Sequence, residues 1–214
     1  IDAANNSIGG LTAWRALIDK KIDKQIVGGV ATPGPNRSFD LLPGQGLDGI
    51  DAVTPLLFGA EEAPGVLVVG KLFTNPGNGT TNCLDRASPA QIDGLTLTGS
   101  SAGGGVLASG YACDLQVSNN RLVSNYGTYG GGVRIGHTML VDGNAYTDAF
   151  NRNVNIHHNW ISQNGATSMG GGGGITLGTG SDSYLVSDNY ICGNFSMSDG
   201  GGISHLGRSA GSIG

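Results

Sequence analysis

Residues 115–125 read Leu115-Gln116-Val117-Ser118-Asn119-Asn120-Arg121-Leu122-Val123-Ser124-Asn125, and the pattern of this stretch decides the fold. Two apolar residues stand two apart, an asparagine follows, and a further apolar residue and a second asparagine complete the pattern. The same spacing recurs from Val154 to Asn164 and from Tyr184 to Asn194. Self-similarity on this scale is typical of repeat architectures.

Each copy is followed by a glycine run and a β-branched residue, and a weaker copy runs from Ile92 to Val106. Asn120 and Asn159 are 39 residues apart, and Asn159 and Asn189 are 30 apart. From one glycine run to the next, the steps are 27, 42 and 28 residues. The longer step indicates an insertion, which we place at residues 137–153.

Apolar residues two apart, punctuated by Asn and Gly, indicate short strands joined by tight turns. A unit of three such strands cannot bury its apolar positions alone, so units must stack strand over strand about 4.8 Å apart. We therefore predict an all-β fold, a parallel β-helix (solenoid), over residues 63–214. A disordered Gly-rich linker is the alternative, but it would not keep aliphatic residues at fixed offsets from asparagine.

The asparagines have two expected roles. Asparagine tolerates the left-handed backbone of a sharp turn, and its amide can bond to the copies above and below it. We expect a ladder formed by Asn120, Asn125, Asn159, Asn164, Asn189 and Asn194. Glycine runs suit turns with positive φ or close backbone approach.

The N-terminal segment, residues 1–62, is predicted to hold one amphipathic helix over 11–24, ended by Gly28-Gly29. Its apolar face comprises Leu11, Trp14, Ile18 and Ile22, with Leu17 beside them. The helix would cap the open end of the stack, whose strand edges need cover, or dock a partner. Residues 31–62 read as loops, with short strands at 39–42 and 53–58 as an option, and 66–69 as a strand.

Composition excludes some classes of protein. The net charge is −5, glycine accounts for 40 of 214 residues without a collagen period, and no basic stripe suggests nucleic-acid binding. No apolar run approaches ~18 residues, so we expect no membrane-spanning segment. A surface rich in Ser, Thr, Asn and Gly fits a secreted or cell-surface protein. The chain opens on Ile1 without a start Met, and we expect it to be a fragment of a longer repeat protein.

Three cysteines leave the pairing open. Cys83 and Cys113 are one unit apart and either pair or stay reduced. Cys192 stands next to an inward position, and we expect a buried thiol.

Metal and histidine sites are weakly signalled. Asp142, Asn144 and Asp148 in the insertion are candidate calcium ligands, against a solvated loop as the simpler interpretation. His157 and His158 are expected on opposite faces of a strand. We interpret these two, His137 and His205 as surface or turn histidines.

Catalytic residues are not evident. Acidic side chains do not recur at equivalent offsets, and although Arg134 and Asp114 could approach each other, no motif singles them out. No catalytic residue or bound cofactor is predicted, apart from the calcium option.

The Gly-Gly-Gly-(Ile/Val) tetrapeptides and the Asn120…Asn125 spacing resemble the right-handed parallel β-helix repeat proteins of bacterial surfaces. That group includes pectate-lyase-like folds and repeats like those of polymorphic outer-membrane proteins. The resemblance covers about residues 90–207 and implies a right-handed β-helix, while its members range from polysaccharide lyases and hydrolases to adhesins. This chain lacks the paired-Asp and basic motifs of the enzymes.

We therefore expect a secreted or cell-surface, non-catalytic scaffold or adhesin, able to self-assemble, whose partners are cell-surface glycans or copies of itself. The alternative is a polysaccharide lyase or hydrolase domain whose active residues lie partly outside this chain.

Overall fold

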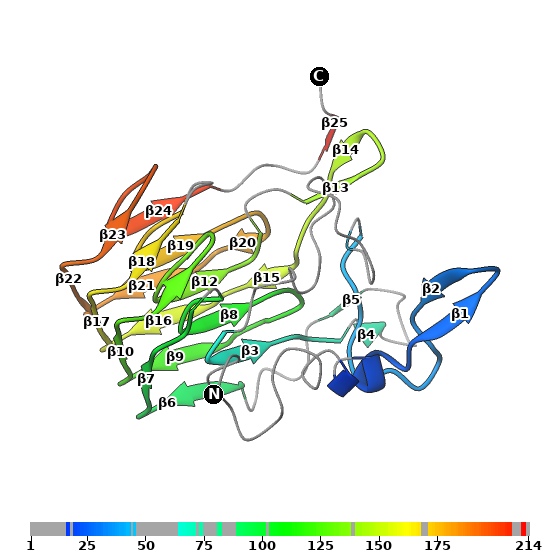
Figure 1. The fold of residues 1–214 in the computed structure, drawn as a ribbon, viewed down its shortest axis with the longest axis horizontal. Coiled ribbons are helices and arrows are strands. Elements are labelled where there is room, and N and C mark those ends of the chain that lie inside the picture. The colour runs from blue at the N-terminus through cyan, green and yellow to red at the C-terminus, as the bar shows by residue number, and fades with distance from the viewer. Residues whose placement is uncertain are drawn as a thin grey trace.

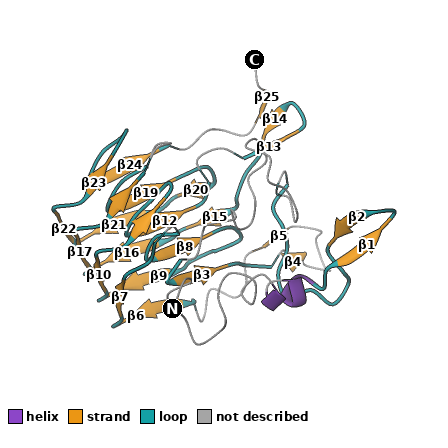
Figure 2. Ribbon diagram, viewed as in Figure 1, coloured by secondary structure: helices purple, strands orange, loops and turns teal. Residues whose placement is uncertain are grey.

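The computed structural model describes residues 16–17, 19–43, 45, 64–71, 73–74, 81–82, 89–101, 103–137, 140–167, 171–206 and 211–212. These residues form short strands and turns, and only 16–17 and 19–22 are helical (Figure 2). The prediction of a mostly β chain is confirmed.

Four parallel sheets hold the strands of the repeats, and successive repeats lie one above another (Figure 1). Sheet 1 contains β6 (Gln91–Asp93), β9 (Gln116–Ser118), β16 (Asn155–His157) and β21 (Leu185–Ser187). Sheet 2 contains β7 (Thr96–Thr98), β10 (Arg121–Val123), β17 (Trp160–Ser162) and β22 (Tyr190–Cys192). Sheet 3 contains β11 (Tyr126–Gly127), β18 (Gly165–Ala166) and β23 (Phe195–Ser196). Sheet 4 contains β3 (Val66–Val68), β8 (Val106–Ala108), β12 (Val133–Ile135), β19 (Ile175–Leu177) and β24 (Ile203–His205).

The pairing register follows the sequence repeat. Leu122 pairs with Ile161, and Ile161 pairs in turn with Ile191. Ile156 likewise pairs with Val117 and with Val186. Because the side chains of a strand alternate between its faces, this register places equivalent aliphatic residues in columns. We refer to this set of sheets as the stack.

The core of the stack is made of these columns. Its buried members include Leu115, Val117, Leu122, Val133, Ile135, Val154, Ile156, Ile161, Ile175 and Leu177. Burying one such side chain contributes about 1.5–3 kcal/mol relative to exposure. Tyr184, Val186 and Ile191 of the last repeat pack against the same cluster but are only partly buried.

The corners between sheets correct one expectation. The residue with positive φ is not the repeated asparagine but the residue before it: Asn119 (φ 53), Ser124 (φ 56), His158 (φ 55), Gln163 (φ 57), Asp188 (φ 55) and Gly193 (φ 63). These residues are exposed, whereas the asparagine after each of them is buried or half-buried. The asparagine is therefore needed for its side-chain amide and not for its backbone.

The glycine runs allow backbones to approach closely. A Cβ on Gly131 would lie 2.5 Å from the carbonyl oxygen of Gly173 and 2.6 Å from the backbone nitrogen of Gly165. Those distances are too short for any side chain. Gly131 does not have positive φ, so lack of space is what requires glycine here.

The N-terminal segment differs from the prediction. Of the helix expected over 11–24, residues 11–15 and 18 lie outside the described part, and helical residues end at 22. Gly28 and Gly29 (φ 60 and 82) turn an antiparallel hairpin of β1 (Gln25–Val27) and β2 (Val30–Thr32). β-branched residues on both sides of Gly-Gly are a hairpin signal. The hairpin begins at Gln25, shortly after the helical residues end.

Residues 39–42 form a buried loop instead of the optional strand, and 53–58 lie outside the described residues. Leu42 packs with Leu140 and Ala149, beside the stacked rings of Tyr111 and Phe150. The insertion is also not a plain loop, because it holds three short strands. They are β13 (Val141–Asp142), β14 (Ala145–Tyr146) and β15 (Asn151–Arg152).

The remaining strands pair locally. β14 pairs with both β13 and β25 (Gly211–Ser212) in antiparallel fashion, and β15 pairs in parallel with β20 (Ser181–Asp182). β4 (Phe73–Thr74) and β5 (Thr81–Asn82) form a further antiparallel pair.

Candidate functional site

The six asparagines lie in two columns at the corners of the stack. Asn159 Oδ1 accepts from the backbone N–H of Asn120 at 2.9 Å and from its Nδ2 at 3.0 Å. Asn189 does the same for Asn159, and the column of Asn125, Asn164 and Asn194 repeats the pattern. Each asparagine also donates from Nδ2 to a carbonyl of the preceding repeat. The ladder is thus a continuous network that satisfies buried polar groups at the turns.

A second polar cluster lies where sheet 4 meets the N-terminal segment. Ser109 follows β8, His137 follows β12, and Gln45 reaches them from far earlier in the chain. Gln45 Nε2 lies 3.2 Å from Ser109 Oγ, and Ser109 Oγ lies 3.3 Å from His137 Nε2. Arg134 Nη2 lies 3.4 Å from His137 Nδ1. All four residues are buried.

A serine beside a histidine invites comparison with nucleophilic catalysis, but burial opposes it, because the side chains of Ser109 and His137 are both enclosed by the fold. Burial, and then the Arg134 charge, lower the pKa of His137 to about 3, so the ring is neutral. Two donor groups face this ring, because Arg134 Nη2 lies 3.4 Å from Nδ1 and the Gln45 amide nitrogen lies 3.3 Å from Nε2. The ring is therefore a packed part of the fold, whereas a catalytic base must lie within reach of a bound substrate.

This buried cluster was missed by sequence reasoning, which interpreted His137 as a surface or turn residue; that interpretation is wrong. Gln45 lies 92 residues away from His137 in sequence, and no local sequence pattern predicts a contact between them. Arg134 is held by the carbonyl oxygen of Gly136 and lies 5.0 Å from the centre of the Tyr129 ring. Asp114, which the sequence suggested could approach Arg134, accepts a hydrogen bond from Asn153 Nδ2.

The adjacent histidines also correct an expectation. His157 and His158 do not point to opposite faces, because His158 leaves the strand with φ 55. Their Nδ1 atoms lie 2.9 Å apart. Nearby on sheet 1, Asp93 accepts from Ser118 Oγ and Asn119 Nδ2, and these bonds, the serine's first, lower the pKa of the carboxyl.

His205 is exposed and pairs in register with Leu177, and its Nδ1 lies 3.1 Å from the hydroxyl of Tyr184. This position agrees with the surface interpretation.

Four aromatic residues project from sheets 2 and 3. Trp160 and Tyr190 are paired neighbours on β17 and β22, with ring centres 4.2 Å apart and planes tilted by 33°. The indole Nε1 donates to Ser162 Oγ at 2.9 Å, which fixes the ring. Tyr126 and Phe195 flank Gly165 in the next column. We call Tyr126, Trp160, Tyr190 and Phe195 the aromatic row.

The aromatic row is accessible. Its side chains are between 43% and 55% exposed, and the strands that carry Trp160, Tyr190 and Phe195 lie along the left side of the stack in Figure 1. Soluble proteins rarely leave several large aromatic rings together in water, and such patches mark binding surfaces. The sequence contains these aromatics, but only the register shows that they gather on one side.

The candidate calcium ligands lie in and shortly after the β13–β14 hairpin. Asp142 and Asn144 are exposed at the β13–β14 hairpin, and Asp148 Oδ1 accepts from the backbone N–H of Phe150 at 2.7 Å. Across the described ranges, no three His, Cys, Asp or Glu side chains form a group that could hold a metal ion.

The cysteines differ from expectation in one case. Cys113 is disulfide-bonded, and Cys83 lies outside the described residues. Cys192 is a free, exposed thiol and not a buried one. On β22 it is Ile191 that points inward, so its neighbours Tyr190 and Cys192 share the outer face.

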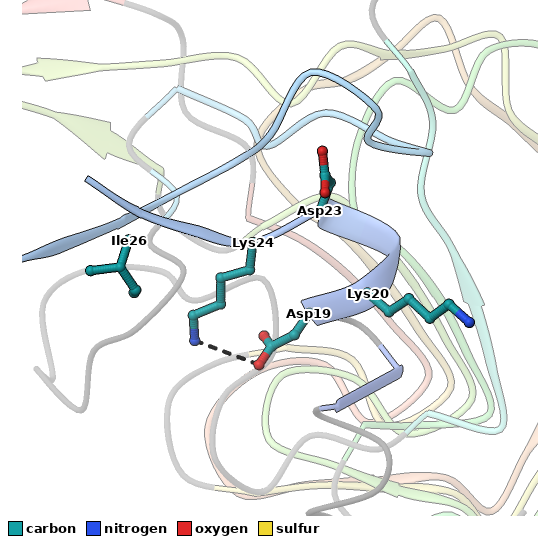
Figure 3. Close-up of a pocket in the computed structure, with 5 residues that line it drawn as sticks. All are labelled: Asp19, Lys20, Asp23, Lys24 and Ile26. Carbon is teal, nitrogen blue, oxygen red and sulfur yellow. Dashed lines mark ion pairs between the residues drawn. The ribbon is translucent and has the colours of Figure 1, made fainter.

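The N-terminal segment contains an open pocket of about 430 Å³, lined by Asp19, Lys20, Asp23, Lys24 and Ile26 (Figure 3). Lys24 pairs with Asp19 at 3.6 Å, while Lys20 points away from that pair. A part-exposed ion pair of this kind contributes at most about 1 kcal/mol to stability.

No protein-family model, curated protein or solved structure matches this chain. Within the described part of the chain, no helix is long and apolar enough to cross a membrane.

Proposed function

We propose that this chain is a non-catalytic scaffold of a secreted or cell-surface protein, and that its aromatic row binds glycans. The scaffold proposed is a right-handed parallel β-helix, in which the four sheets are the walls and the asparagine columns mark the corners. Support for it comes from the unbroken register between equivalent strands.

The observation that carries the binding proposal is the contact between Trp160 and Tyr190 on the solvent-facing side of sheet 2. Tryptophan and tyrosine combine a large apolar ring with a polar edge. A sugar ring has matching chemistry, because its C–H groups form an apolar face and its hydroxyls form a polar rim. A rigid sheet holds the aromatic rings in place before the ligand arrives, which lowers the entropic cost of binding.

A non-catalytic role is supported by how the titratable groups are used. The neutral His137 is enclosed by three polar neighbours, and its hydrogen-bonding nitrogens are both engaged. An oxidising compartment is supported by the disulfide at Cys113.

The test is glycan binding by wild-type protein and by the variants W160A and Y190A. Losing a central aromatic residue typically costs more than 1–2 kcal/mol of binding free energy, so we expect affinity to fall at least about tenfold. L185A is the matched control, since Leu185 is 55% exposed on sheet 1, away from the aromatic row. Equal binding by W160A and L185A would refute the proposal.

The same samples test the enzymatic alternative. Release of new reducing or unsaturated chain ends from a bound polysaccharide would show that the protein is a hydrolase or a lyase. We expect none with wild-type protein, even at concentrations that saturate binding.

A further inference from the structure

Two histidines lie side by side where β16 ends, on the outer face of sheet 1. Ile156 belongs to the core, so the next residue, His157, points outward. His158 follows with φ 55, and this left-handed turn leaves its ring next to that of His157. The two Nδ1 atoms lie 2.9 Å apart, and the ring planes stand at 89° to each other. His158 is exposed and His157 is half-buried, so solvent reaches the pair.

The stacking of repeats does not require histidine at either position. The equivalent residues are Ser118 and Asn119 in the preceding repeat, and Ser187 and Asp188 in the following one. Asn119 and Asp188 adopt the same left-handed conformation as His158, with φ 53 and φ 55. Among the described residues, the only hydrogen-bond partner of either imidazole ring is the other ring. The pair is therefore free to serve a purpose other than folding.

The separation of the two nitrogens suits a metal ion. Two ligand nitrogens at 90° around an ion, with bonds of about 2.0–2.1 Å, lie about 2.8–3.0 Å apart, whereas tetrahedral coordination needs about 3.3–3.4 Å. One Nδ1 atom can donate to the other only while it carries a hydrogen. When both rings carry their hydrogen on Nε2, two lone pairs face the same space, and a cation relieves their repulsion. The solvent-accessible rings need only turn about their side-chain bonds for both lone pairs to meet one ion.

The charges around the pair favour a cation. Ser187 pairs in register with His157, and neighbouring strands lie about 4.8 Å apart. The residues that follow these two, Asp188 and His158, are therefore neighbours at the corner. Asp93 stands on the same face of sheet 1, two strands before His157. The strands of this sheet contain no lysine or arginine, so no cationic side chain of sheet 1 offsets the two carboxylates.

We propose that His157 and His158 bind a divalent transition-metal ion, Ni²⁺ or Cu²⁺, through their two Nδ1 atoms. Both ions accept imidazole nitrogens at 90° in square-planar or tetragonal coordination. Water completes the coordination, because no third His, Cys, Asp or Glu side chain of the described residues joins the pair. The site is therefore open and differs from closed, four-coordinate structural sites.

The test is a calorimetric titration of Ni²⁺ into wild-type protein that carries no histidine tag. H157S and H158N introduce the residue types of the preceding repeat, Ser118 and Asn119, so the corner accommodates each of them. We expect either substitution to weaken Ni²⁺ binding at least about tenfold, because a chelate of two nitrogens becomes a single contact. H205N is the matched control, since it removes another exposed histidine and should bind Ni²⁺ as wild type does.

Ni²⁺ is the probe because the exposed thiol of Cys192 would reduce Cu²⁺. C192S and W160A should both bind Ni²⁺ as tightly as wild type does, so the result is independent of the thiol and of glycan binding. Paramagnetic Ni²⁺ should broaden the NMR signals of the two imidazoles before those of His205. Three results would overturn the proposal: no Ni²⁺ binding by wild type, equal binding by the two histidine variants and H205N, or loss of binding in C192S.

Discussion

His137 is a histidine that folding keeps neutral, because Gln45 and Ser109 enclose it and Arg134 stands beside it. Its pKa falls from 6.5 to about 3. Between those values the unfolded chain binds a proton that the folded chain does not. Stability therefore rises with pH in this window and is lost as the pH falls from about 6.5 towards 3.

The variant H137Q removes this titration while keeping a polar side chain. Between pH 7 and pH 5, we expect the free energy of unfolding of wild-type protein to fall by about 2 kcal/mol more than that of H137Q. Denaturant titration of both proteins at each pH provides the measurement. Wild-type protein and H137Q contain the same carboxylates. An equal fall of their free energies of unfolding between pH 7 and pH 5 would therefore mean that His137 is not held neutral by the fold.

Asn159 stabilises two repeats at once, since it accepts two hydrogen bonds from Asn120 and donates to the carbonyl of Val117. N159A leaves these buried groups without partners, and we expect a loss of about 2–4 kcal/mol in unfolding free energy. N144A is the control, because Asn144 is exposed in the β13–β14 turn, and should change stability by less than about 0.5 kcal/mol. Similar losses in both variants would contradict the role given to the ladder.

At the scale of elements, the glycine runs set how closely the connection between β11 and β12 approaches β18 and the glycine run before β19. A methyl group at Gly131 would collide with backbone atoms of Gly165 and Gly173, so G131A must displace a neighbouring repeat. We expect it to lower the thermal midpoint far more than G193A, where no atom lies within 4 Å. G193A should cost only about 1 kcal/mol, from its positive φ. Equal shifts in calorimetry would show that close approach is unimportant.

The sequence predicts elements well where spacing repeats. The offsets of Leu122, Ile161 and Ile191 from the asparagines predicted parallel pairing in register, because a one-residue slip would turn the aliphatic face outward. Prediction fails where a contact joins residues that are far apart in the sequence, or where a shift of one residue decides which face of a strand a side chain occupies. Gln45 contacts His137 although the two are 92 residues apart in the sequence. Cys192 faces outward because the inward position of its strand is occupied by the preceding residue, Ile191.

Element types were also harder to predict near the N-terminus, where no repeat supports the interpretation. The helical pattern continued as far as Lys24, but the strand-forming residues around Gly28 and Gly29 favour a hairpin that begins at Gln25. The aromatic row illustrates the same limit for the candidate site. Trp160 and Tyr190 are 30 residues apart in the sequence, and only the pairing of β17 with β22 brings their rings together.

At the scale of the whole molecule, everything proposed depends on residues 30 or 39 apart becoming vertical neighbours. The aromatic row exists only if the repeats stack in register, and the asparagine ladder is continuous only under the same condition. The proposed β-helix would then be a rigid support with one side that carries the aromatic rings.

A single substitution tests that stacking directly. Ser162 pairs in register with the native Cys192, and neighbouring strands place paired residues about 4.8 Å apart, within the range that a disulfide spans. S162C should therefore form a disulfide with Cys192 under mild oxidation, seen by mass spectrometry of proteolytic fragments. S187C, closer to Cys192 in sequence but on sheet 1, should leave both thiols free. Cross-linking in S187C but not in S162C would contradict the stacked register.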